Sequence, residues 1–123
     1  MSQRLLNQLR RFCLALPDAC ETNSWGHPNF RAGKKTFAVY EVYKGRSSIA
    51  VKLPPPEGER RLADARFYRT PYTGKNGWVS LWVDVPVPWT LVKELVLQSY
   101  REVASEKQLA SLARPRPRKA RKA

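Results

Sequence analysis

The sequence predicts an α+β domain, an antiparallel sheet with two long terminal helices packed on one face. Three observations carry this prediction. Apolar residues recur at helical spacing near both ends of the chain, at 3–16 and 90–104. Between them lie short stretches rich in β-branched and aromatic residues. Short turns join these stretches, and neighbouring strands joined by short turns must be antiparallel.

Both long helices have recognisable ends. The helix at 3–16 begins after Ser2, which can cap it, and it ends at Pro17, because the residue before a proline avoids helical backbone angles. The helix at 90–104 follows two prolines, with Thr90 as the expected cap. Residues 106–113 add a further helical turn or two.

The clearest strand pair is predicted at residues 35–43 and 47–53, with Gly45 in the turn between them. The register depends on the length of that turn. A two-residue loop places the even-numbered residues of the first strand on the face of Ile49 and Val51. A three-residue loop places the odd-numbered residues there instead, and the sequence leaves both registers open.

The remaining elements are shorter. Short strands are predicted near residues 21–25 and before the turn at 33–34, and a short helix at 57–65. The chain is expected to be extended from residue 67 to an Asn76-Gly77 hairpin turn, since both residues tolerate positive φ. The strand after this turn, at 78–84, alternates, with Val79, Leu81 and Val83 on one face and Trp78, Ser80 and Trp82 on the other.

The charge of the chain is strongly positive. Its 123 residues carry a net charge of +13, which indicates a polyanionic partner. Residues 1–113 are predicted to form a single domain with a net charge of +7. Residues 114–123 are predicted to be a disordered basic tail, because prolines and like charges oppose folding. This tail either binds phosphates or only aids solubility; its cations are Arg114, Arg116, Arg118, Lys119, Arg121 and Lys122.

Nothing in the sequence nominates a catalyst. His27 is the one histidine, and no acid or base stands at a motif spacing from it. Cys13, Cys20 and His27 have the wrong spacing for a zinc site, so no metal and no cofactor are expected. The chain is therefore predicted not to be an enzyme, and two cysteines are too few for a disulfide scaffold.

Basic residues at predicted turns and strand ends are the candidate binding residues. Hairpins with cationic tips can act as wings that contact phosphates beside a groove. Trp78 and Trp82 either stack on bases or pack beneath the 66–77 segment as a second small core. The candidate nucleic-acid-binding residues of the domain are Lys34, Lys35, Lys44, Arg46, Lys52, Arg69, Lys75, Asn76 and Trp78.

Several of these segments, taken in order, resemble the MmcQ/YjbR family. The matching segments are residues 16–19, 25–31, 33–38, 51–53, 72–79 and 99–104. The resemblance covers about residues 5–110 and leaves the basic tail outside. It implies a CyaY-like fold, similar to frataxin, and a DNA-binding role through a "double wing" arrangement. Lys35, Lys52, Lys75 and Trp78 map to family positions. The iron chemistry of frataxin-like folds does not transfer, because that chemistry uses an acidic ridge and this chain has none.

These observations give one function hypothesis and one alternative. The first is a non-catalytic, cytoplasmic protein that binds nucleic acid, duplex DNA in particular, with little sequence preference. The alternative is a non-catalytic module that binds a protein or an anionic ligand and has an accessory basic tail. A continuous basic face joining the hairpin tips favours the first. A pocket holding Lys52, Trp78 and His27 together favours the second. No membrane span is expected, since no apolar run is long enough.

Overall fold

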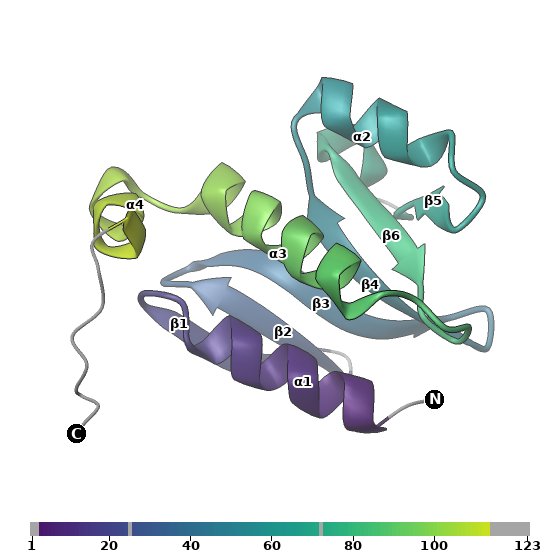
Figure 1. Ribbon diagram of the computed structural model, residues 1–123, viewed down its shortest axis with the longest axis horizontal. Helices are drawn as coiled ribbons and strands as arrows, with labels where there is room; N and C mark the ends of the chain where they lie inside the picture. Colours follow the sequence, from purple (N-terminus) through teal and green to yellow (C-terminus); the bar gives the residue numbers. More distant parts are fainter. Residues whose placement is uncertain (1–2, 25, 72, 114–123) are drawn as a thin grey trace.

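The computed structural model contains a six-stranded antiparallel sheet and four α-helices in the part of the chain it describes (Figure 1). It describes residues 3–24, 26–71 and 73–113, and the side chain of Lys75 also lies outside this description. The helices are α1 (Gln3–Leu14), α2 (Pro55–Leu62), α3 (Trp89–Val103) and α4 (Glu106–Ala113). The strands are β1 (Ala19–Ser24), β2 (His27–Ala32), β3 (Lys35–Tyr43), β4 (Arg46–Lys52), β5 (Phe67–Arg69) and β6 (Trp78–Trp82). Their order in the sheet is β1-β2-β3-β4-β6-β5.

One face of the sheet is covered by helices (Figure 1). α1 packs on β1 and β2, α3 on β3 and β4, and α2 on β5 and β6. The core lies between these two layers, and Leu9, Phe30, Val51 and Val96 are at most 1% exposed in it. The α+β class is confirmed. The two long helices are α1 and α3, and α4 follows α3, so the second long helix is not the last one. The CyaY-like arrangement stays a prediction.

The β3–β4 hairpin adopts the register of a two-residue loop. Lys44 and Gly45 both have positive φ (54° and 76°), the geometry that suits the twist of the flanking strands. Tyr40 therefore pairs with Ile49, and the two share the covered face.

The structure also adds a bulge that the sequence did not indicate. Phe30 pairs with Ala38 and Arg31 pairs with Thr36, which leaves Phe37 as an extra residue in β3. The bulge allows the adjacent side chains of Phe37 and Ala38 both to be fully buried.

Two residues of α3 attach the helix to the sheet and to the segment that follows α1. The backbone N–H of Lys52 donates to Ser99 Oγ at 2.8 Å, and that hydroxyl donates to the carbonyl oxygen of Phe37 at 2.6 Å. The neighbouring Tyr100 hydroxyl donates to the carbonyl of Pro17 at 2.6 Å. Ser99 therefore joins β3 and β4 at the bulge.

The connection between β5 and β6 differs from the prediction. The expected Asn76-Gly77 hairpin turn is wrong, because the short 3₁₀ helix η1 (Gly74–Asn76) comes first and only Gly77 adopts positive φ (94°). A Cβ at Gly77 would lie 2.9 Å from the carbonyl oxygen of Leu53, so this close approach requires glycine. The predicted strand 78–84 is shortened to β6.

The helix ends also differ in detail from the predictions. Thr90 is not the cap of α3, because Pro88 occupies that position and the helix has no side-chain cap. Residues 106–113 form the separate helix α4, in which the backbone N–H of Gln108 donates to Ser105 Oγ at 3.1 Å and the backbone N–H of Ser105 donates to the side chain of Gln108. Ser2 and the basic tail at 114–123 lie outside the described residues.

Candidate functional site

The face of the sheet opposite the helices carries a pocket of about 480 Å³. Paired positions run across it: Asn29 lies beside Val39, Val39 beside Ala50, and Ala50 beside Ser80. Because side chains alternate along a strand, these positions face away from the helix-covered core. Val39, Ala50, Pro71 and Trp78 are the apolar part of the lining, and polar side chains from β1, β2, β3 and the segment after β5 form the rest.

Glu41 and His27 line the pocket from adjacent strands. The pairing of Asn29 with Val39 brings His27 level with Glu41, two residues further along each strand. Burial raises the pKa of the Glu41 carboxyl above its ordinary value, and the nearby His27 opposes this shift. No hydrogen bond or ion pair joins Glu41 to another described residue, so its oxygens remain available to a group that enters the pocket.

The two tryptophans of β6 have different surroundings. Trp78 lines the pocket and is half-buried. Two side chains lie against the ring of Trp82: the ring of Tyr68 stacks on it at 4.2 Å between centroids, and the guanidinium of Arg46 lies 4.0 Å from its centroid. These contacts compete with a base for the Trp82 ring. The small second core is therefore the better description of Trp82, whereas Trp78 faces the pocket.

Tyr68 is held at the centre of this aromatic cluster. Its hydroxyl lies 2.9 Å from Ser48 Oγ, and its ring also stacks on Tyr43 at 5.2 Å. Burial raises the pKa of the Tyr68 phenol, against a smaller opposing effect of the Ser48 hydrogen bond. The cluster thus fixes the open face next to the pocket, and it includes Ser48, which is fully buried beneath the rings.

The two hairpin tips, at residues 44–46 and 75–76, lie at opposite ends of the sheet. Lys44 and Arg46 flank the β3–β4 turn. The second tip belongs to η1, just before Trp78, which pairs with Lys52 at the other end of β4. Six residues of extended chain separate Arg46 from Lys52, which is about 20 Å. Lys34, in the turn before β3, and Lys35, the first residue of β3, lie at the Lys52 end. Among the described residues, no continuous basic face joins both tips, since Glu41, Ser48 and Ala50 lie on the face between them.

The candidate cations also differ in how far they are already neutralised. Arg46 forms a two-pronged ion pair with Asp84, with its Nε 2.7 Å from the carboxylate, and Arg69 pairs with Glu59 at 3.3 Å. Other candidates have no ion pair within the described part of the chain. They are Lys34, Lys35 and Lys44, which are exposed, and Lys52, which is half-buried. Asn76 is exposed too, and the Lys75 side chain lies outside the described residues.

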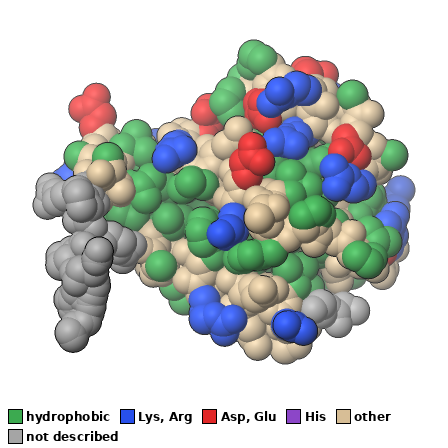
Figure 2. All heavy atoms as spheres, in the orientation of Figure 1, with side chains coloured by type: hydrophobic (Ala, Val, Ile, Leu, Met, Phe, Trp, Pro, Cys, Tyr) green, Lys and Arg blue, Asp and Glu red, His purple; other side chains and the backbone are tan. Residues whose placement is uncertain are grey.

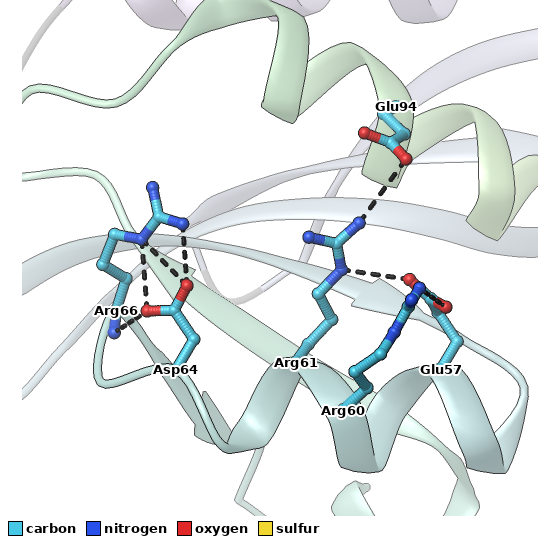
Figure 3. Close-up of polar contacts among 6 residues, drawn as sticks. All are labelled: Glu57, Arg60, Arg61, Asp64, Arg66 and Glu94. Carbon is cyan, nitrogen blue, oxygen red and sulfur yellow. Dashed lines mark hydrogen bonds and ion pairs between the residues drawn. The ribbon is translucent and has the colours of Figure 1, made fainter.

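The cations of α2 are likewise paired. Glu57 binds both Arg60 and Arg61, and Arg61 reaches Glu94 of α3 at 3.5 Å (Figure 3). Arg66, just after the helix, pairs with Asp64 and lowers the pKa of that carboxyl to about 2. Figure 2 shows acidic and basic side chains intermingled over α2. The region around α2 therefore has little free positive charge.

No group of three or more His, Cys, Asp or Glu side chains that could hold a metal ion occurs among the described residues. Both Cys13, which is buried, and Cys20, which is exposed on β1, are free thiols. The described helices include none that is long and apolar enough to cross a membrane.

The structure brings together residues that the sequence analysis did not connect. His27 and Trp78 line one pocket, as the alternative hypothesis required, but Lys52 is not part of that lining. Glu41 occupies the pocket instead and was missed. The signal for Glu41 was its alternation with Val39 on β3, which becomes informative only once the register of β2 and β3 is known.

Comparisons with known proteins agree on one family and one fold. The model of the YjbR family matches residues 14–102. The crystal structure of the Deinococcus radiodurans protein DR2400, with a DUF419 domain, aligns with a TM-score of 0.73 at 23% identity, over 89% of this chain and 88% of that one. A Pseudomonas syringae protein aligns with a TM-score of 0.65 at 14% identity, over 83% and 98%. No curated protein matches.

An α+β protein with an antiparallel sheet and one open face is thus the class that the fold and the site define. The chain belongs to the YjbR family, because the family model covers most of its length. The two solved structures are less than 25% identical to it, so their likeness shows the fold alone.

Proposed function

We propose that this YjbR-family protein binds nucleic acid, duplex DNA in particular, without catalysis and with little sequence preference. The observation that carries the proposal is the group of Lys34, Lys35 and Lys52 at one end of the sheet. None of the three has an ion-pair partner among the described residues, so each can contact a phosphate without first breaking an ion pair. Phosphate contacts supply affinity that does not depend on sequence.

The position of α4 supports the choice of this end of the sheet as the contact region. A Cβ on Gly33, in the turn before β3, would lie 3.2 Å from the side chain of Gln108 in α4. The basic residues 114–123 continue from this helix in sequence. Gly33 directly precedes Lys34, so α4 lies beside this end of the sheet, which is the proposed primary contact.

The proposal differs from the double-wing arrangement, in which both hairpin tips contact phosphates beside one groove. Because the two tips lie about 20 Å apart along β4, they contact separate stretches of a polyanion rather than one groove. Lys44 remains a candidate for the second contact. Arg46 and Arg69 contribute less, because Asp84 and Glu59 already neutralise them.

A salt titration of binding to random-sequence duplex DNA tests the proposal. The logarithm of the affinity should fall linearly with the logarithm of salt concentration, by about 0.9 for each phosphate contact. Lys34→Ala combined with Lys35→Ala should make that slope shallower by about 1.8. The matched control is Arg4→Ala combined with Lys93→Ala, which removes two charges from α1 and α3 and should leave the slope unchanged.

Removal of residues 114–123 separates the tail from the domain. The truncated protein should bind more weakly, with a shallower slope, and it should lose affinity equally for all sequences. An affinity that ignores salt would overturn the proposal. A truncated protein with no affinity at low salt would show that the domain is not the binder.

A further inference from the structure

The pocket on the open face is not used by the proposed phosphate contacts. Among the described residues that line it, none is a lysine or arginine, and Glu41 would repel an anion. Its volume of about 480 Å³ is within the range of pockets that hold small organic ligands. The pocket therefore suits a ligand that is not a phosphate, which also counts against the anionic ligand of the alternative hypothesis.

Two side chains from opposite parts of the sheet face this pocket. Trp78 is on β6 and Glu41 is on β3, with β4 between them, and the pairs Lys52–Trp78 and Ser48–Glu41 place them four residues apart along the strands. Strand spacing and rise give roughly 16 Å between their Cα atoms. Both side chains line the same pocket, whose volume accommodates one planar ring system.

The chemistry of Trp78 and Glu41 limits the class of ligand that the pocket can bind. A half-buried aromatic side chain provides a stacking surface, and a carboxylate that has no hydrogen bond to another described residue accepts two parallel N–H donors. A cationic ligand also satisfies a carboxylate, but the net charge of +13 repels cations from the protein. A neutral heterocycle with two adjacent N–H groups on one edge meets both requirements.

We infer that the pocket binds one guanine base, with its N1–H and N2–H groups donating to the Glu41 carboxylate and its ring stacked on Trp78. Guanine is the common base whose pairing edge offers two adjacent N–H donors. The base comes either from a free nucleoside or from a nucleic-acid strand in which it is unpaired and unstacked, since pairing with cytosine would occupy both N–H groups. The second source rests on the proposed function, whereas the first does not.

Guanosine, which carries no phosphate, tests the pocket alone. Titration into the full-length protein, followed by NMR at the indole N–H of Trp78, should show saturable binding at least about tenfold tighter than for adenosine, cytidine or uridine. Glu41→Gln should weaken guanosine binding about tenfold, because the amide replaces one acceptor with a donor. Glu102→Gln, the same change at an exposed site on α3, should have no effect.

A matched pair of substitutions tests whether the base stacks on Trp78. Trp78→Leu should weaken guanosine binding about tenfold, while Trp82→Leu should leave it unchanged. Because Trp78→Leu removes the indole signal, binding to both variants is followed by NMR shifts of other residues in the pocket. Thermal unfolding of each variant verifies that it is folded. Absence of saturable guanosine binding, or equal loss from the two tryptophan substitutions, would overturn the inference.

Two oligonucleotides distinguish the sources of the base. An 11-mer of thymine and the same 11-mer with one central guanine carry equal numbers of phosphates, so phosphate contacts contribute equally to both. A preference for the second that Glu41→Gln abolishes supports a base from a strand. Guanosine binding without that preference supports a free nucleoside. If guanosine binds while no nucleic acid binds at low salt, the pocket stands and the proposed function fails.

Discussion

On the covered face of the sheet, Val51, Val79 and Leu81 are at most 2% exposed, whereas on the open face Val39, Glu41 and Trp78 are only partly buried. β6 supplies residues to both sets, because successive side chains of a strand point to opposite faces. Apolar burial against the helices specifies the fold through one set of positions. The alternate set is left free to hold a carboxylate, a histidine and aromatic rings beside a pocket.

The open face is nevertheless ordered by packing of its own. Ser48, Ala50 and Ser80 are buried there although no helix covers them, because larger side chains such as Tyr68 lie over them. Small residues at these positions leave room for the rings. The two faces therefore differ in how they are ordered as well as in exposure. A continuous apolar layer stabilises the covered face, and a few specific polar and ring contacts order the open face.

The largest expected effect concerns the hydrogen bonds that join the covered face to α3. Ser99→Ala should lower the free energy of unfolding by about 3 kcal/mol, because the backbone N–H of Lys52 and the carbonyl of Phe37 both lose a buried partner. Urea unfolding followed by circular dichroism measures the change. Ser105→Ala removes an exposed cap of α4 and should cost only about 1 kcal/mol. Equal losses would show that the bulge does not depend on Ser99.

A smaller effect is expected when the same valine-to-alanine substitution is made on each face. Val51→Ala, on the covered face, should cost about 2 kcal/mol, from two buried methyl groups and the cavity they leave. Val39→Ala, on the open face, should cost less than about 1 kcal/mol, because the site is already in contact with water. Urea unfolding midpoints at constant slope test the pair. If Val39→Ala costs as much as Val51→Ala, the open face is a second core and not a binding face.

Much of the fold could be predicted from the sequence. Apolar spacing predicted α1 and α3, and β-rich stretches predicted β3, β4 and β6, because burial on one face imposes a period that a sequence displays. The alternation of β6 was right, residue by residue. What failed were features set by tertiary contacts: η1 replaces the Asn76-Gly77 turn, since Gly77 must fit against the carbonyl of Leu53.

The candidate site was less predictable than the fold. Basic residues are visible in a sequence, but whether each is free depends on partners far along the chain, as with Arg46 and Asp84. The bulge at Phe37 shifts the register of β2 against β3, and that register decides that His27 lies beside Glu41. No local pattern contains such information, so the pocket emerged only from the structure.

The smallest expected effect concerns Glu41 and depends on pH. Burial raises the pKa of this carboxyl in the folded state above its ordinary value of 4.5, and His27 opposes the shift only in part. The folded protein therefore holds the proton more tightly than the unfolded chain does. Below pH 4.5 the group is neutral in both states and costs nothing. As pH rises through 4.5 and then through the raised pKa, ionisation progressively destabilises the folded state.

Glu41→Gln removes this ionisation while keeping the shape of the side chain. Its free energy of unfolding should match that of the wild type at pH 4 and exceed it at pH 7, as measured by urea unfolding at both values. Glu102→Gln, at an exposed site on α3, corrects for the change in net charge. A variant no more stable than the wild type at pH 7, after that correction, would mean that Glu41 is already satisfied within the protein, and the open face would then lack the free carboxylate that distinguishes it from the covered one.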